Sequence, residues 1–118
     1  PPPIPPHLTF DDPSPLNFHI YLEDDDPEPR IARSDFQLAD YRFLSSSTGE
    51  RWAMVNVYNP LKSSRRLRAD QIQATFFNGE KKHPRQLDKF IRGERTLTLF
   101  INFGRHSLPL HSLEVRNR

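Results

Sequence analysis

Residues 52–58 read Trp-Ala-Met-Val-Asn-Val-Tyr, and this alternation decides the fold. Successive side chains of a β-strand point to opposite faces, so the segment has one face of small aliphatic residues and one of larger residues. The inner set is Ala53, Val55 and Val57, and the outer set is Trp52, Met54 and Tyr58. Asn59 and Pro60 follow, and proline cannot donate to a sheet ladder. We therefore expect a central strand that ends at Tyr58.

The same period of two recurs along the chain. It predicts further strands over residues 17–22, 36–46, 72–77, 95–103 and 110–115. A turn is expected at 45–50, after the second of these strands. Asn78-Gly79 follows the third, and both residues tolerate positive φ, so the pair predicts a type I′ hairpin with a return strand starting near Glu80.

Two segments give weaker signals. Residues 62–66 are polar and basic, and we interpret them as a loop. Between Pro84 and Gly93, a short helix would place Leu87, Phe90 and Ile91 on one face, with proline near its start and glycine after its end. A strand or an open loop fits this segment comparably well.

Six to eight short strands with little helical periodicity predict an all-β fold. We expect an antiparallel immunoglobulin-like β-sandwich, and a small closed β-barrel is the alternative. At 118 residues the chain is long enough for one domain. We divide it into a Pro-rich extended arm over 1–16 and a single sandwich domain over 17–118. The first residue is not Met, so we also expect the chain to be part of a longer gene product.

Charge is divided between the two ends of the chain. Residues 1–40 hold nine acidic and two basic side chains, whereas residues 41–118 hold fifteen basic and six acidic ones. Nine of the twelve prolines precede residue 30, together with apolar residues that solvent exposure would leave unpacked. These apolar residues are Ile4, Leu8, Phe10 and Leu16. We expect the arm to pack them on the outer aromatic residues of the body, with charge setting its orientation.

The candidate partner-binding residues combine cationic and aromatic side chains. They are Arg65, Arg66, Arg68, Lys81, Lys82 and Arg85, with Trp52, Tyr58, Phe77 and Phe100. Lys89 and Arg92 extend the second basic group. Cations beside aromatic rings can neutralise phosphates and stack on bases, so a polyanion is one possible partner. The other is a protein segment that binds sheet edges or basic loops.

Enzyme chemistry has no support in the sequence. Glycine-rich phosphate loops, His-Glu-x-x-His and Gly-x-Ser-x-Gly are absent, as is cysteine. The acidic run 24–28 lacks the spacing of a calcium loop, and His106 and His111 would lie on opposite faces of an unbroken strand. We predict no catalytic residue, metal site or cofactor.

The leading hypothesis is a non-enzymatic protein-interaction or structural module, part of a larger or exported assembly. Its expected partners are another protein or a second copy of the chain. The alternative is a nucleic-acid-binding domain that uses the basic C-terminal two-thirds. No apolar run is long enough to cross a bilayer. A periplasmic or secreted location is favoured over a cytoplasmic one.

Overall fold

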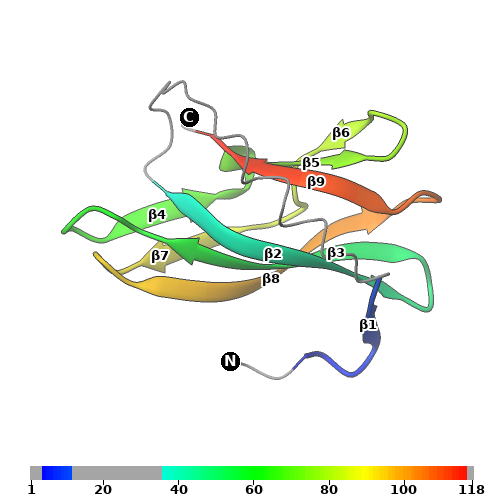
Figure 1. Ribbon diagram of the computed structural model, residues 1–118, viewed down its shortest axis with the longest axis horizontal. Helices are drawn as coiled ribbons and strands as arrows, with labels where there is room; N and C mark the ends of the chain where they lie inside the picture. The colour runs from blue at the N-terminus through cyan, green and yellow to red at the C-terminus, as the bar shows by residue number, and fades with distance from the viewer. Residues whose placement is uncertain (1–3, 12–35, 117–118) are drawn as a thin grey trace.

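The computed structural model describes residues 4–11 and 36–116, and in these ranges the chain is all-β (Figure 1). All paired strands are antiparallel, and they form three sheets of strand order β1-β2-β3-β8, β4-β7 and β6-β5-β9. The strands are β1 (Leu8–Phe10), β2 (Gln37–Ser46), β3 (Glu50–Tyr58), β4 (Arg65–Arg68), β5 (Ile72–Phe76), β6 (Lys81–Lys82), β7 (Asp88–Ile91), β8 (Thr96–Arg105) and β9 (Leu110–Val115). One turn of 3₁₀ helix, η2 (Ala69–Gln71), joins β4 to β5.

Strand β3 is central in the largest sheet, as residues 52–58 predict. Ala53, Val55 and Val57 are fully buried, and Leu99 and Ile101 of β8 lie opposite two of them. The strands predicted at 36–46, 72–77, 95–103 and 110–115 are all present, with ends that differ from the predicted ones by a few residues at most. The strand predicted at 17–22 and the acidic run 24–28 lie outside the described residues.

One apolar core joins the sheets. Leu67 of β4, Phe76 of β5 and Ile91 of β7 pack in the same cluster as Val55 of β3 and Phe103 of β8. Burying each such side chain contributes about 1.5–3 kcal/mol, so this cluster holds the three sheets together. The sheets do not close into a barrel, because β8 ends the four-stranded sheet without pairing with β1, β7 or β9. The barrel alternative is therefore wrong for the described residues.

Two sequence interpretations need correction. Arg65–Arg68 is strand β4 rather than part of a loop, and it pairs with Asp88–Ile91, so the helix considered for 84–93 is also wrong. The strand signal at β4 is weak because its outward positions carry arginine and only Leu67 is fully buried. In β7 only Ile91 is buried. Strands of four residues with one buried residue each show no alternation that a sequence pattern could reveal.

The turn between β5 and β6 also differs from the prediction. The Gly79 N–H donates to the Phe76 carbonyl at 2.9 Å, and the Phe76 N–H donates to the Glu80 carbonyl at 2.8 Å. Gly79 has φ 91°, whereas Asn78 is not among the described residues with positive φ. The loop therefore has three residues and ends on a left-handed glycine, as in a type I turn with a bulge, rather than the type I′ turn that Asn-Gly predicts.

A buried asparagine links the ends of four strands. Asn59 is fully buried, and its side-chain amide donates to the carbonyls of Ser63 and Ile91, each at 2.9 Å. Its Oδ1 accepts the Leu61 N–H, and its backbone carbonyl accepts the Glu94 N–H. The β3–β4 loop and the β7–β8 turn are thereby bound to each other. Leaving such groups unpaired in the interior would cost about 1–3 kcal/mol each.

Gly93 makes this linkage possible and provides a test of it. A Cβ atom at Gly93 would overlap the backbone carbonyl of Lys62, so Gly93→Ala must separate the loop from the turn. We expect a loss of about 1–3 kcal/mol, the usual cost of overpacking, measured as a lower midpoint of thermal unfolding by circular dichroism. Gly79→Ala is the matched control, because its Cβ would meet open space and only the positive φ is strained. A midpoint for Gly93→Ala no lower than that of the control would contradict the close approach.

Candidate interaction surfaces

The residues selected from the sequence fall in five places rather than one. Arg65, Arg66 and Arg68 lie on β4, whereas Lys81 and Lys82 lie on β6 in a different sheet. Trp52, Tyr58 and Phe100 share the outer face of the four-stranded sheet, Phe77 lies in the β5–β6 turn and Arg85 lies in the segment before β7. The two basic groups are not wholly separate, because the β4–β7 pairing brings Lys89 beside Leu67.

The outward face of the β4–β7 pair carries a cation stacked on an aromatic ring. The Arg66 guanidinium carbon lies 5.0 Å from the centroid of the Phe90 ring, and its Nε lies 3.1 Å from Asp88 Oδ1. Phe90 remains 63% exposed, whereas Ile91, which the helix considered for 84–93 would place on the same face, is buried. Exposed arginine–aromatic pairs are typical of binding surfaces. The sequence does not reveal this pair, because it leaves 84–93 open between helix, strand and loop and gives no sign that the segment pairs with β4.

The outer face of the four-stranded sheet is aromatic but only half exposed. Met54 lies opposite Phe100, and Trp52 lies opposite Leu44 of β2, which is fully buried. Tyr58 ends the same face beside Thr96. Phe10 of strand β1 lies beside Leu44 in the register of the outer sheet.

Strand β1 pairs with the edge of β2 within the same chain. Leu8 is 4% exposed, and Phe10 lies opposite Leu44 in the register. The Arg42 guanidinium carbon lies 3.8 Å from the centroid of the Phe10 ring, and the His7 ring meets Trp52 edge-on at 5.6 Å between centroids. The sequence signal for this strand is only three residues long, between the prolines of the predicted arm.

A polar chain continues from β1 into the body. The Asp11 N–H donates to the Phe43 carbonyl at 2.9 Å, and Asp11 Oδ1 accepts the Ser45 hydroxyl at 2.7 Å. Arg51 donates to Ser45 Oγ at 2.8 Å and to the His106 carbonyl at 2.9 Å. The second oxygen of Asp11 is buried with no hydrogen-bond partner. These hydrogen bonds connect the end of β1 to Ser45 of β2, to Arg51 of β3 and to His106, which follows β8.

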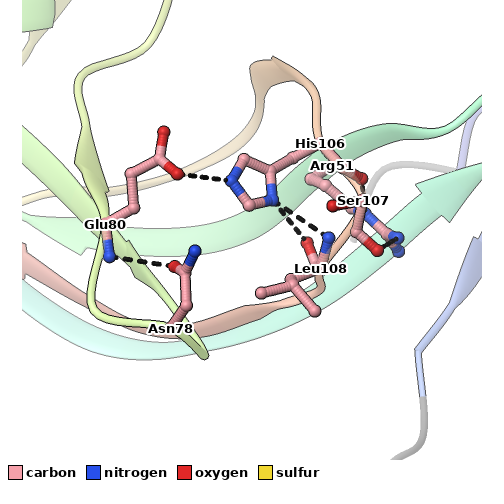
Figure 2. A network of polar contacts seen from close by, with 6 residues as sticks. All are labelled: Arg51, Asn78, Glu80, His106, Ser107 and Leu108. Carbon is pink, nitrogen blue, oxygen red and sulfur yellow. Dashed lines mark hydrogen bonds and ion pairs between the residues drawn. The ribbon is translucent and has the colours of Figure 1, made fainter.

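The β5–β6 turn is held by a histidine (Figure 2). The His106 ring stacks on Phe76 with 3.6 Å between centroids and 9° between planes, and its side chain is only 11% exposed. His106 Nε2 lies 2.9 Å from Glu80 Oε1, while Nδ1 lies 3.0 Å from the Leu108 N–H that donates to it. His106 is therefore packed against the turn rather than displayed on the surface, whereas His111 is exposed and meets Phe77 edge-on.

The described residues contain no group of three His, Asp or Glu side chains placed to hold a metal ion. They also contain no helix with the length and apolar character that a membrane crossing needs. What the arrangement offers is exposed apolar and cationic surface, together with strand edges that pair with no other strand in residues 4–11 and 36–116. Comparisons with models of protein families, with curated proteins and with solved structures find no match to this chain.

The contact between Glu80 and His106 predicts a pH dependence. The hydrogen bond from His106 lowers the pKa of Glu80 below its ordinary value of 4.5. The contribution of Glu80 to stability is therefore present above pH 4.5 and is lost as the pH falls through the lowered pKa of the folded state. We expect Glu80→Gln to melt below the parent protein at pH 7, and the difference to close under acid conditions.

Thermal unfolding followed by circular dichroism between pH 7 and pH 3 measures this difference. Glu114→Gln is the matched control, because Glu114 is an exposed glutamate on the neighbouring strand β9. A gap between Glu80→Gln and the parent that stays constant throughout the pH range would contradict the prediction.

Proposed function

We propose that this protein is a non-enzymatic interaction module that joins polypeptide segments by strand addition, as part of a larger assembly. The observation that supports the proposal is the addition of β1 to the β2 edge. The β2 edge pairs with a short extended segment that is flanked by prolines. Side chains at alternate positions of this segment, Leu8 and Phe10, lie on the same face of the sheet. Recognition of this kind takes affinity from backbone bonds and specificity from side-chain pockets.

The side chains of β1 account for its placement more than its backbone does. Burial of Leu8 contributes about 1.5–3 kcal/mol, and the Arg42–Phe10 contact about 0.5–1 kcal/mol at an exposed site. A three-residue ladder must offset the ordering of its own backbone, which costs about 1–2 kcal/mol per residue. The β2 edge therefore favours segments with apolar side chains two positions apart.

For the fold, we propose the immunoglobulin-like sandwich as the finer description. Its support is the packing of β3 and β8 from one sheet against β5 and β9 from another in one core cluster. Domains of this architecture present loops and edge strands around a rigid core. That arrangement suits a module whose partners bind at its margins.

One observation favours a second function. The β4–β7 face combines the Arg66–Phe90 stack with the exposed cation Arg68, which the register places on the same face. A single-stranded nucleic acid needs phosphate neutralisation beside a stacking platform, and this face offers both. Asp88 weakens the case for nucleic-acid binding, because its carboxylate lies on the same face and already pairs with Arg66.

Strand addition at the β2 edge predicts binding in trans. Leu8→Asp would place a carboxylate in a buried position, so we expect β1 to detach and Trp52 fluorescence to shift to the red. Trp52 is the only tryptophan, which makes the signal specific. A peptide with the sequence of residues 4–11 should then bind this variant and restore the emission.

Thr9→Asp is the control, because Thr9 is exposed in the same strand. We expect it to retain β1 and to leave the added peptide unbound. Circular dichroism establishes that both variants are folded. A folded Leu8→Asp protein that ignores the peptide would refute strand exchange at this edge.

The nucleic-acid alternative predicts that a labelled single-stranded oligonucleotide binds at low salt and dissociates steeply as salt is raised. Phe90→Ala should weaken this binding by about 1–3 kcal/mol, the worth of one stacked base. Phe77→Ala, which removes another exposed aromatic residue on a different sheet margin, should leave it unchanged. Fluorescence anisotropy at two salt concentrations measures both effects, and equal losses from the two variants would exclude the β4–β7 face.

A further inference from the structure

Two cationic side chains converge on Gly104, near the end of β8. A Cβ atom at Gly104 would lie 3.5 Å from Lys82 Nζ and 3.9 Å from Arg85 Cδ, so both side chains come within 4 Å of one point. Gly104 is buried, and Lys82 is half-buried. Because glycine has no Cβ, the ammonium group of Lys82 and the stem of Arg85 can approach the β8 backbone closely.

The backbone brings these two side chains together. Lys82 lies opposite Ala74, a buried residue of β5, so its side chain is on the inner face of the β5–β6 pair. Further along the chain, the Arg85 N–H donates to the Asn102 carbonyl of β8 at 3.4 Å. The segment from Lys82 to Arg85 thus passes from β6 to β8 and places both cations at the same end of β8.

Neither cation has an acidic partner in the described part of the chain. Among residues 4–11 and 36–116, the side chains of Lys82 and Arg85 form no hydrogen bond and no ion pair. Glu80 is occupied by His106 (Figure 2): of the groups that lower the pKa of Glu80, the hydrogen bond from His106 contributes most and Lys82 least. Two cations held close together repel each other, and an anion bound by both would remove this repulsion.

An amide donor lies beside the two cations. Asn102 Oδ1 accepts the Gly104 N–H at 2.8 Å, which orients the amide group. Its Nδ2 is then a donor next to Gly104 that has no acceptor among the described residues. Ammonium, guanidinium and amide N–H groups all donate hydrogen bonds. The surroundings of Gly104 therefore suit a ligand with several acceptor oxygens and more than one negative charge.

We propose that Lys82, Arg85 and Asn102 form a site around Gly104 for a phosphate monoester, presented by a phosphorylated side chain of a partner protein. The monoester has three terminal oxygens and a charge of about −1.5 to −2 at pH 7. The guanidinium fork of Arg85 can bind two of these oxygens, and Lys82 can neutralise the remaining charge. A carboxylate or a phosphodiester has a single charge and would leave one cation without a partner.

This inference goes beyond strand addition at the β2 edge. The site lies at the β8 margin, on the opposite side of the four-stranded sheet from β1, and it uses none of the residues that bind β1. Recognition of a phosphorylated motif by clustered cations is a separate mode of protein interaction.

The test uses the full chain and N-acetyl-phosphoserine N-methylamide, here called the blocked phosphoserine, at pH 7 and low salt. Binding is followed at the Gly104 amide in ¹⁵N–¹H correlation spectra, where the four glycines of the chain form a small set of signals. We expect a saturable shift of the Gly104 signal. Lys82→Met and Arg85→Met should each weaken binding by about tenfold or more, as expected for loss of a charged hydrogen bond.

Lys81→Met is the charge-matched control. Lys81 is exposed and precedes Lys82 in β6, so its side chain lies on the opposite face of the strand. We expect it to change the affinity little. Circular dichroism establishes that all three variants are folded. Equal losses of affinity from Lys81→Met and Lys82→Met would mean general charge attraction and would overturn the site.

Ligands with one charge test the preference for a monoester. Dimethyl phosphate and N-acetyl-aspartate N-methylamide each carry a single negative charge at pH 7. We expect both to bind at least about tenfold more weakly than the blocked phosphoserine, because each can form fewer charged hydrogen bonds. Equal affinity for the three ligands would contradict a site built for a doubly charged group.

Inorganic phosphate separates a free anion from a phosphorylated partner. If it shifts the Gly104 signal and the blocked phosphoserine does not, the site accepts a free ion only and the proposal of a partner is overturned. Strand addition is measured independently, since the peptide of residues 4–11 should bind the Leu8→Asp protein with or without Lys82→Met. Loss of the phosphate site alone therefore leaves strand addition standing, and loss of peptide binding alone leaves the phosphate site standing.

Discussion

The hydrogen bonds of Asn59 are the constraint on which the arrangement of strands depends. Its buried side chain binds the β3–β4 loop through Ser63 and the end of β7 through Ile91. The close approach of Gly93 to Lys62 completes this contact. The chain leaving β7 is thereby held beside the beginning of β4, and β7 forms its ladder with β4 instead of β8. This polar linkage lies where the chain passes from β7 to β8, two strands that share no ladder.

The two sides of the β2-β3-β8 sheet therefore differ in what lies beside them. The β2 edge is covered by β1, which adds two apolar anchors and a polar chain through Asp11 and Ser45. At the β8 edge, the Arg85 N–H is the one backbone donor that reaches residues 96–102 from outside the sheet among the described residues. Uncovered edges invite pairing with other chains, and cationic side chains beside them are a common protection. Arg85 and Lys89 are exposed cations of this kind beside β8.

Residues 52–58 predict β3 and the side of it that is buried, because a long alternation leaves one interpretation only. The strands around it were found for the same reason, with Leu99, Ile101 and Phe103 correctly turned inward. β1, β4 and β7 were missed as strands or left ambiguous, since each contributes one or two anchoring residues and the pairing partner is distant in sequence. The turn at Gly79 is also only partly predictable from sequence. Asn78-Gly79 indicates a hairpin, but the contacts of His106 with Phe76 and Glu80 join residues far apart in the chain, which a local pattern cannot show.

Prediction of the candidate surfaces was limited in the same way. Composition identified arginine, lysine and aromatic side chains as the residues to consider, but not which of them meet. Pairing of β4 with β7 decides that Arg66 stacks on Phe90, and the register of β3 decides that Trp52 faces Leu44 and β1. The structure also shows where some of the basic residues of the C-terminal two-thirds lie. Arg66 and Arg68 share the outward face of the β4–β7 pair with Phe90, whereas Lys89 lies on the opposite face beside Leu67. An electrostatic preference at a strand edge selects the partner, whereas the backbone ladder alone would accept any extended chain.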